Sequence, residues 1–286
     1  MMWLRRHDKA AAPPKIVLDL SGPTLRAAFE RLVEDAEETG GIERYVSALA
    51  LKASLFDELL GGGRVASLDE GEFCDLCAFV APARRRIGAW LAQYGFPEMR
   101  YRIERLLAAG SVSAGADARL AEFVAGFPAD RAHRFMRDLG AEVLHFTAPE
   151  DYPLMTRWVW DAGTRTGVLR EIWFADDPDR VRIEASDDAA TFATLAEELS
   201  GFLNENGVFR DRHFYIDLLC AHVYAFYVSD RGGTYLKTEF GGKEDPMAHT
   251  RRLLGLDAVD TETGRTRLKL IGGRAHVLGA PRLLEG

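Results

Sequence analysis

The most apolar stretch of the chain, FRDRHFYIDLLCAHVYAFY at residues 209–227, contains ionisable side chains, among them His213 and Asp217. His213 and Asp217 are four residues apart, so a helix would place them on the same face. A carboxylate among Phe, Ile and Leu is costly to desolvate unless it is paired. Asp217 therefore needs a cationic partner, which could be His213 on the same helix or Arg157 or Arg170 from elsewhere.

This pair has two interpretations. In the catalytic interpretation, an imidazole held by a carboxylate is a general acid–base pair, which predicts an enzyme acting on an anionic substrate with help from nearby arginines. In the structural interpretation, Asp217 joins two elements through one buried salt bridge. The structural interpretation is favoured, because few other catalytic groups converge on the pair in the sequence.

Aromatic and arginine side chains are concentrated between residues 150 and 175. Clusters of Trp, Tyr and Arg are typical of ligand pockets and of protein interfaces. The leading hypothesis is therefore an accessory or regulatory protein that binds a protein partner or a small anionic ligand through this region. Packing of Trp158 and Trp160 into the core is the alternative. The candidate binding residues are Tyr152, Arg157, Trp158, Trp160, Arg165, Arg170 and Trp173, together with Tyr224 from the apolar stretch.

A third candidate is the pair Cys74 and Cys77, which a helix would also place on one face. Two cysteines at this spacing could supply two metal ligands, but zinc and iron–sulfur sites normally need four. A metalloprotein is therefore only a weaker alternative. Burial of both thiols as small apolar residues is the favoured interpretation.

Composition and charge limit the class of protein. The 286 residues carry 36 basic and 44 acidic side chains, a net charge of −8 that argues against nucleic acid as a partner. Three cysteines cannot form a disulfide framework, and no apolar run reaches the roughly 20 residues that span a bilayer. Arg5 and Arg6 are not followed by the apolar segment of an export signal, so a cytoplasmic protein is expected. The phosphate-loop, dinucleotide, HExxH and Gly-x-Ser-x-Gly motifs are absent, and no cofactor is predicted.

The elements that must position these residues are helical in the first half of the chain. Apolar residues recur at helical spacing between Ser21 and Gly40, over Ile42–Leu60, and from Ser67 past Cys77. Ser21 is placed to cap the first helix, and Ser67 with Glu70 matches a capping box for the third. Shorter helical patterns follow at residues 98–109, 117–125 and 130–139, and the short loops favour an antiparallel bundle.

The second half of the sequence predicts helices combined with strands. Leu169–Phe174 and Val181–Ala185 are predicted to pair as one hairpin, and the basic segment around Gly272-Gly273 as another. A third strand is predicted at Thr234–Phe240. The predicted helices are one that Ser186 caps and Gly207 ends, a buried one at 212–229, and a short one at 246–254.

These elements predict a mostly helical α+β fold, with an N-terminal helical bundle followed by helices packed on one or two small antiparallel hairpins. The predicted organisation is a flexible arm at residues 1–15, a bundle at 16–146 and an α+β region at 147–286. The last two could form one continuous domain.

Overall fold

A computed structural model describes residues 16–108, 115–177, 180–231, 245, 247–271 and 274–279. The chain is mostly helical with one small antiparallel sheet among these residues, which confirms the predicted fold class. The elements are α1 (Gly22–Glu37), α2 (Ile42–Leu60), η1 (Gly61–Ser67), α3 (Glu70–Ala78), α4 (Ile87–Tyr94), α5 (Phe96–Leu107), α6 (Ala116–Ala125), α7 (Phe135–Thr147), α8 (Val168–Glu171), α9 (Ala189–Glu205), α10 (Arg212–Arg231), α12 (Ala248–Leu253), β1 (Arg265–Lys269) and β2 (Ala275–Val277).

Local sequence signals explain several helix boundaries. Ser21 caps α1, as predicted, by accepting a hydrogen bond from the Thr24 amide. The capping box of α3 is formed by Asp69 and Glu72 rather than by Ser67 and Glu70. Ser67 is instead the last residue of η1, the turn that the three glycines after α2 produce. The N-cap of α9 is Asp188, whose side chain accepts from the Thr191 amide, and not the predicted Ser186.

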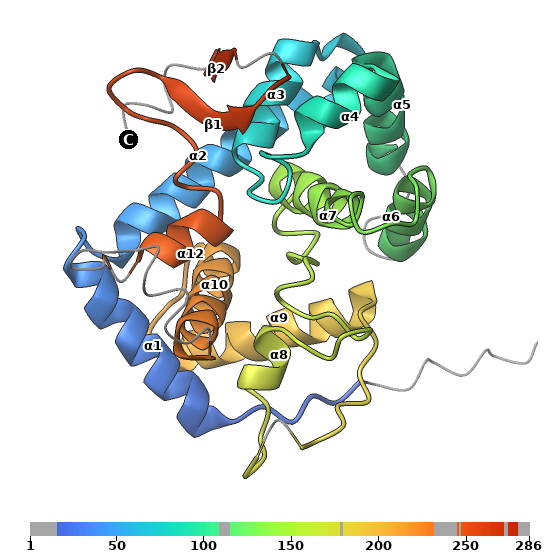
Figure 1. Cartoon of the computed structure of the whole chain (residues 1–286). Helices are drawn as coiled ribbons and strands as arrows, with labels where there is room; N and C mark the ends of the chain where they lie inside the picture. The colour runs from blue at the N-terminus through green and yellow to red at the C-terminus, as the bar shows by residue number, and fades with distance from the viewer. Residues whose placement is uncertain are drawn as a thin grey trace, which may run out of the picture.

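Helix α2 connects the two halves of the fold (Figure 1). It packs against α7 and α3 on one side of the molecule and against α1 and α10 on the other. Helices α5, α6 and α7 pack together in the upper half, whereas α10 contacts α8, α9 and α12 in the lower half. Each helix that carries a candidate site residue therefore contacts α2, or contacts a helix that does.

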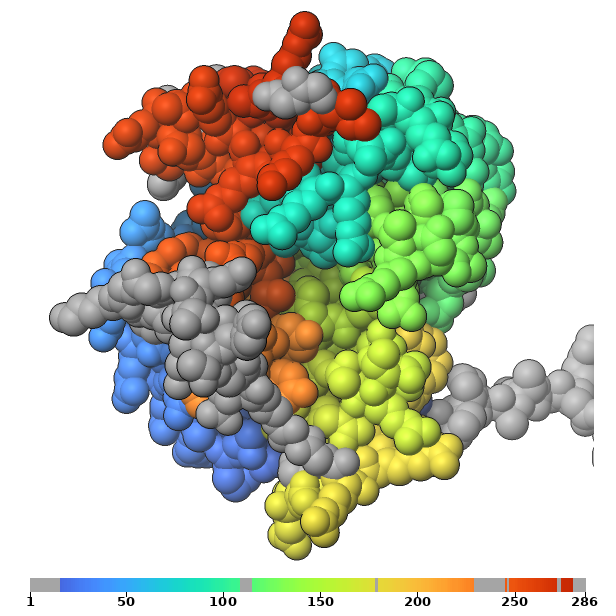
Figure 2. All heavy atoms as spheres, viewed as in Figure 1, coloured from blue at the N-terminus to red at the C-terminus, as the bar shows by residue number. Residues whose placement is uncertain are grey.

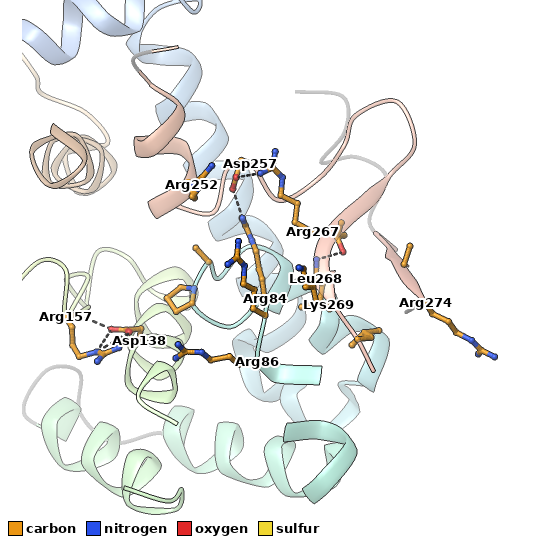
Figure 3. Close-up of a pocket in the computed structure, with 16 residues that line it drawn as sticks. Arg84, Arg86, Asp138, Arg157, Arg252, Asp257, Arg267, Leu268, Lys269 and Arg274 are labelled. Atoms are coloured by element: carbon orange, nitrogen blue, oxygen red, sulfur yellow. Dashed lines mark hydrogen bonds and ion pairs between the residues drawn. The ribbon is translucent and has the colours of Figure 1, made fainter. Parts of the chain in front are cut away.

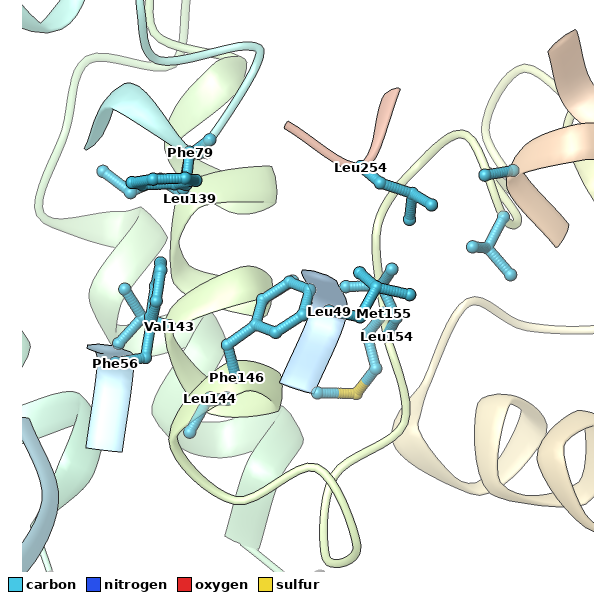
Figure 4. Packing of buried hydrophobic residues seen from close by; sticks show 14 of the residues in the cluster. Leu49, Phe56, Phe79, Leu139, Val143, Leu144, Phe146, Leu154, Met155 and Leu254 are labelled. Carbon is cyan, nitrogen blue, oxygen red and sulfur yellow. The ribbon is translucent and has the colours of Figure 1, made fainter. Parts of the chain in front are cut away.

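Buried hydrophobic side chains from both halves of the sequence form one cluster. Phe56 of α2 packs against Phe146 of α7, with ring centroids 5.5 Å apart. Leu254, which follows α12, and Met155, which follows α7, extend the same cluster (Figure 4). This shared core fixes the C-terminal segment against the N-terminal helices.

The predicted hairpin of Leu169–Phe174 with Val181–Ala185 does not form. The first of these segments begins with the short helix α8, and residues 181–186 belong to neither a helix nor a strand. Ile172 and Phe174 exchange backbone hydrogen bonds with residues 19–21 instead. Backbone pairing with residues 19–21 thus replaces the predicted pairing with Val181–Ala185.

The C-terminal hairpin is formed as predicted. Strands β1 and β2 pair antiparallel, with Arg265 opposite Val277 and Lys269 opposite Ala275. The buried carboxylate of Asp75 on α3 holds this hairpin by accepting hydrogen bonds from His276 Nε2 at 2.6 Å and the Gly279 amide at 3.0 Å. The predicted turn at Gly272-Gly273, the predicted strand at Thr234–Phe240 and the predicted arm at 1–15 lie outside the described residues. Within the described part of the chain, none of the helices is long and apolar enough to cross a bilayer.

Candidate functional site

Helix α7 carries three buried ionisable side chains on one face. Asp138, Glu142 and His145 follow one another at spacings of four and three residues, and each is at most 3% exposed. Each pairs with a side chain from another part of the fold, as buried charges must. We call these three residues and their partners Arg157, Lys52 and Asp217 the buried charge row.

The partner of Asp217 is His145, not His213. His145 Nε2 lies 2.7 Å from Asp217 Oδ2, and its Nδ1 donates to the Tyr152 carbonyl oxygen at 2.7 Å. Burial alone would lower the pKa of His145, but the charge and hydrogen bond of Asp217 outweigh it, so this pKa is raised above 6.5. The pair therefore holds a proton between α7 and α10.

The arrangement around Asp217 leaves little room for a substrate. The adjoining cavity has a volume of about 20 Å³, enough for one water molecule, and its other walls are largely apolar. His213 makes no hydrogen bond or ion pair with Asp217 among the described contacts, and burial lowers its pKa. The structure therefore does not assemble His213 and Asp217 into the predicted bonded pair.

Lys52 and Glu142 form the central pair of the buried charge row. Lys52 Nζ donates to Glu142 Oε2 and to the Leu254 carbonyl oxygen, each at 2.8 Å, and lies 3.8 Å from the centre of the Phe146 ring. Burial lowers the pKa of Lys52 and raises that of Glu142, while the attraction between them opposes both shifts. Lys52 thus ties α2, α7 and the C-terminal end of α12 together.

The third pair brings the buried charge row to the surface. Asp138 accepts from the Arg157 amide at 3.0 Å and from its guanidinium at 2.6 Å. Asp138 is buried, but the Arg157 side chain is 27% exposed, and both residues line a cleft. Burial would lower the pKa of Arg157, but Asp138 raises it, so the guanidinium stays charged.

This cleft has a volume of about 1330 Å³ and is strongly basic. Its walls come from residues 81–86, from α7 with Arg157, and from the segment between α12 and β2 (Figures 2 and 3). Eight basic side chains and two carboxylates line it, an excess of six positive charges in a chain whose net charge is −8. We call it the basic cleft. Its basic residues are Arg84, Arg85, Arg86, Arg157, Arg252, Arg267, Lys269 and Arg274.

Apart from Arg157 and Arg252, the basic residues of the cleft are of two kinds. Residues of the first kind are paired with a carboxylate. Arg84 is buried and donates to Asp257 at 2.6 Å and to the Ala78 and Gly255 carbonyl oxygens. Arg267 also pairs with Asp257, at 3.0 Å. The other kind comprises Arg85, Arg86, Lys269 and Arg274, which are exposed and have no carboxylate within ion-pair distance among the described residues.

Close backbone contacts fix the shape of the cleft. Gly255 has φ +75°, and a Cβ there would lie 1.8 Å from the Phe79 carbonyl oxygen, so no other residue fits. A Cβ at Gly88 of α4 would lie 2.5 Å from the Lys269 carbonyl oxygen. The Lys269 amide in turn donates to the Arg84 carbonyl oxygen at 2.8 Å. The walls that carry Arg84, Arg85, Arg86 and Lys269 are thus in direct backbone contact.

No family model, curated protein or solved structure matches this chain. Its function must therefore be inferred from the arrangement of its own residues.

The predicted binding residues of the 150–175 region are dispersed. Arg157 lines the basic cleft, and Trp158 is half-buried beside Tyr224, with ring centroids 6.1 Å apart. Trp160 is completely buried and donates to the Ala185 carbonyl oxygen, so it belongs to the core. Trp173 is half-buried where Ile172 and Phe174 bond to residues 19–21.

Tyr152, Arg165 and Arg170 have separate roles. The Tyr152 hydroxyl accepts a hydrogen bond from Arg119 at 2.7 Å. Arg165 and Arg170 line a second, smaller pocket, where the buried Arg170 donates to the Arg165 and Val181 carbonyl oxygens. The structure therefore brings only part of the predicted set together.

The cysteines are placed as the favoured interpretation expects. Cys74 and Cys77 lie on the buried face of α3, and burial raises the pKa of the Cys74 thiol to about 12. Burial also raises the pKa values of Cys77 and Cys220. No cluster of three or more potential metal-ligating side chains occurs in the part of the chain that the structure describes.

Sequence reasoning missed the buried charge row and the basic cleft. The spacing of Asp138, Glu142 and His145 is a usable signal, because it places three ionisable groups on one helical face that otherwise contains core residues. The run Arg84-Arg85-Arg86, two residues after Pro82, is another. Their partners come from distant positions, so neither signal alone defines a site.

Proposed function

We propose that this protein binds a ligand with several negative charges, most simply phosphate groups, in the basic cleft. The observation that supports this proposal is the local excess of positive charge: eight basic side chains against two carboxylates in one cleft of an acidic chain. Like charges gathered in one concave surface repel one another, and a bound polyanion relieves that repulsion.

The exposed basic side chains of the cleft are suited to binding phosphate groups. Arg85, Arg86, Lys269 and Arg274 carry donors that no carboxylate of the described residues occupies. An arginine guanidinium offers paired N–H donors that match two phosphate oxygens. Arg157 adds a guanidinium whose orientation is fixed by its hydrogen bonds to Asp138. The proposal keeps the predicted anionic ligand and one predicted residue, Arg157, and moves the site from the 150–175 region into the cleft.

Calorimetric titration with tripolyphosphate tests the proposal. The wild-type protein is expected to bind, with an affinity that falls steeply as salt is added, because phosphate contacts are screened. Reversing two charges in Arg85→Glu/Arg86→Glu should weaken binding by at least about tenfold, the equivalent of one lost charge-assisted hydrogen bond.

Arg26→Glu is the matched control. Arg26 is an exposed arginine on α1 that does not line the cleft, so the same reversal there should leave the affinity unchanged. Absence of wild-type binding at a dissociation constant of about 1 mM or better, or equal losses in the cleft variant and the control, would show the proposal to be wrong.

A further inference from the structure

Three partly exposed aromatic side chains form a continuous row next to the basic cleft. The Trp158 and Tyr224 ring centroids are 6.1 Å apart, and those of Tyr224 and Tyr227 are also 6.1 Å apart. Each of these side chains is half-buried, so part of each ring is accessible. We call Trp158, Tyr224 and Tyr227 the aromatic row.

One end of the aromatic row lies next to Arg157, a residue of the basic cleft. Arg157, which lines the cleft, directly precedes Trp158, and its charge lies near enough to the Tyr224 hydroxyl to affect the pKa of that group. Burial has the larger effect and raises the pKa of Tyr224, so its hydroxyl is neutral at physiological pH. The row therefore continues from the cleft as a neutral aromatic surface.

The other end of the aromatic row reaches the second pocket. Tyr227 lines this pocket, which has a volume of about 320 Å³ and contains Arg165, Arg170, Arg180 and Arg182 but no carboxylate. Arg180 pairs with Asp177 and Arg182 with Glu184, and all four side chains are at least 50% exposed. Such exposed pairs contribute little stability and exchange readily for another anion. We call this site the arginine pocket.

In space, the basic cleft is therefore followed by the aromatic row and then by the arginine pocket. A single strand of nucleic acid has the matching chemistry, because its phosphates need cationic grooves while its unpaired bases stack on aromatic rings. Tripolyphosphate has no group that would use the row, and a duplex keeps its bases stacked inside. An acidic peptide matches the arginines but carries no regular flat rings.

Resting on the proposed function of the cleft, we propose that the polyanionic ligand is single-stranded nucleic acid, which runs from the basic cleft over the aromatic row to the arginine pocket. The net charge of −8 does not oppose this, because basic side chains outnumber carboxylates in the lining of both pockets.

Fluorescence anisotropy with end-labelled oligothymidylates tests this proposal. Affinity should rise with length from about 4 to about 16 nucleotides, the range over which single-strand sites of this kind are filled. A duplex of equal length should bind more weakly. Oligouridylate in a parallel titration distinguishes RNA from DNA as the preferred strand.

Substitutions in the aromatic row separate stacking from charge. Tyr224→Ala should weaken binding of the single strand by about 5- to 150-fold, the effect of losing one base–aromatic stack. Tyr224→Phe keeps the ring and should bind as the wild type does. Phe209→Ala is the matched control, because Phe209 is 69% exposed and lines neither pocket. Circular dichroism of each variant verifies that it is folded.

The outcomes distinguish this inference from the proposed function. If tripolyphosphate binds but the single strand binds no tighter than the duplex, or Tyr224→Ala changes nothing, the nucleic-acid inference is wrong and the anion site stands. If Tyr224→Ala is unfolded, Trp158→Ala with the same probes decides between these outcomes. If neither tripolyphosphate nor the strand binds, both proposals are wrong.

Discussion

The buried charge row and the basic cleft meet at the Asp138–Arg157 pair, yet they use their charges differently. In the row, every charge has a partner at hydrogen-bond distance, and the pairs join α7 to α2 and α10. In the cleft, half of the basic side chains have no carboxylate partner among the described residues. Paired buried charges specify how helices fit together, whereas exposed charges of one sign are available to a ligand.

The largest effect is expected in the row, at Lys52. Lys52→Met leaves the Glu142 carboxylate buried without a cation and removes the donor to Leu254. The free energy of unfolding should fall by about 5 kcal/mol, the upper end of the range for a buried pair broken from one side. Lys52→Met/Glu142→Leu should recover most of this loss in chemical denaturation, because two apolar residues leave no charge uncompensated. A loss below about 1 kcal/mol in the single variant would contradict the assigned role.

The next largest effect is expected at Asp217. Asp217→Leu leaves the Nε2 atom of His145 without a partner and should lower the free energy of unfolding by about 3–4 kcal/mol. Asp217→Asn should cost only about 1–2 kcal/mol, because its amide can donate to the neutral imidazole. Equal losses in urea denaturation of the two variants would show that hydrogen bonding to His145 is unimportant.

The pH dependence of stability provides a second test of the His145–Asp217 pair. Because Asp217 raises the pKa of His145 in the folded state, the pair contributes fully below pH 6.5, the ordinary histidine value. This contribution is lost as the pH rises through the raised pKa. Burial lowers the pKa values of His213 and His222, whose contributions therefore have the opposite sign, present above pH 6.5 and lost below it.

Subtracting the stability profile of Asp217→Asn from that of the wild type cancels the contribution of His222, which is common to both proteins. Asp217 also raises the pKa of His213, so the loss of this effect changes the difference in the same direction as the loss of the pair. The difference should decrease with rising pH. A difference that stays constant across the histidine range would contradict a proton held between His145 and Asp217.

The smallest effect on stability is expected in the cleft. Arg85→Glu/Arg86→Glu should change the free energy of unfolding by no more than about 0.5 kcal/mol, because both side chains are exposed and unpaired among the described residues. The same variant is the one expected to lose tripolyphosphate binding. A large loss of stability would show that these arginines are structural after all.

The sequence predicted the elements better than it predicted their partners. Helical spacing located α1, α2, α9 and α10 because one apolar stripe identifies a helix whatever it packs against. The segment from Leu169 to Phe174 was mispredicted because its extended end pairs with residues 19–21, a contact that no local pattern encodes.

The same limit applies to the sites. The apolar surroundings of Asp217 correctly indicated that it needs a partner, but nearness in sequence favoured His213 over His145, 72 positions away. The basic cleft could not be inferred from composition, since a net charge averages over the whole surface. Its arginines come from three separate segments, at residues 84–86, at 157 and at 252–274, and only the fold places them together.

The bond from Lys52 to the Leu254 carbonyl spans 202 positions, and the one from His276 to Asp75 spans 201. Contacts of such high sequence separation require the closure of long loops, which costs chain entropy and slows folding. During synthesis the helices up to α10 emerge before residues 254–276 exist, so Lys52 then lacks the Leu254 carbonyl oxygen and Arg84 lacks Gly255 and Asp257 as acceptors. The cleft is therefore complete only when this last segment has packed, and a chain interrupted before it would lack the wall that carries Arg267, Lys269 and Arg274.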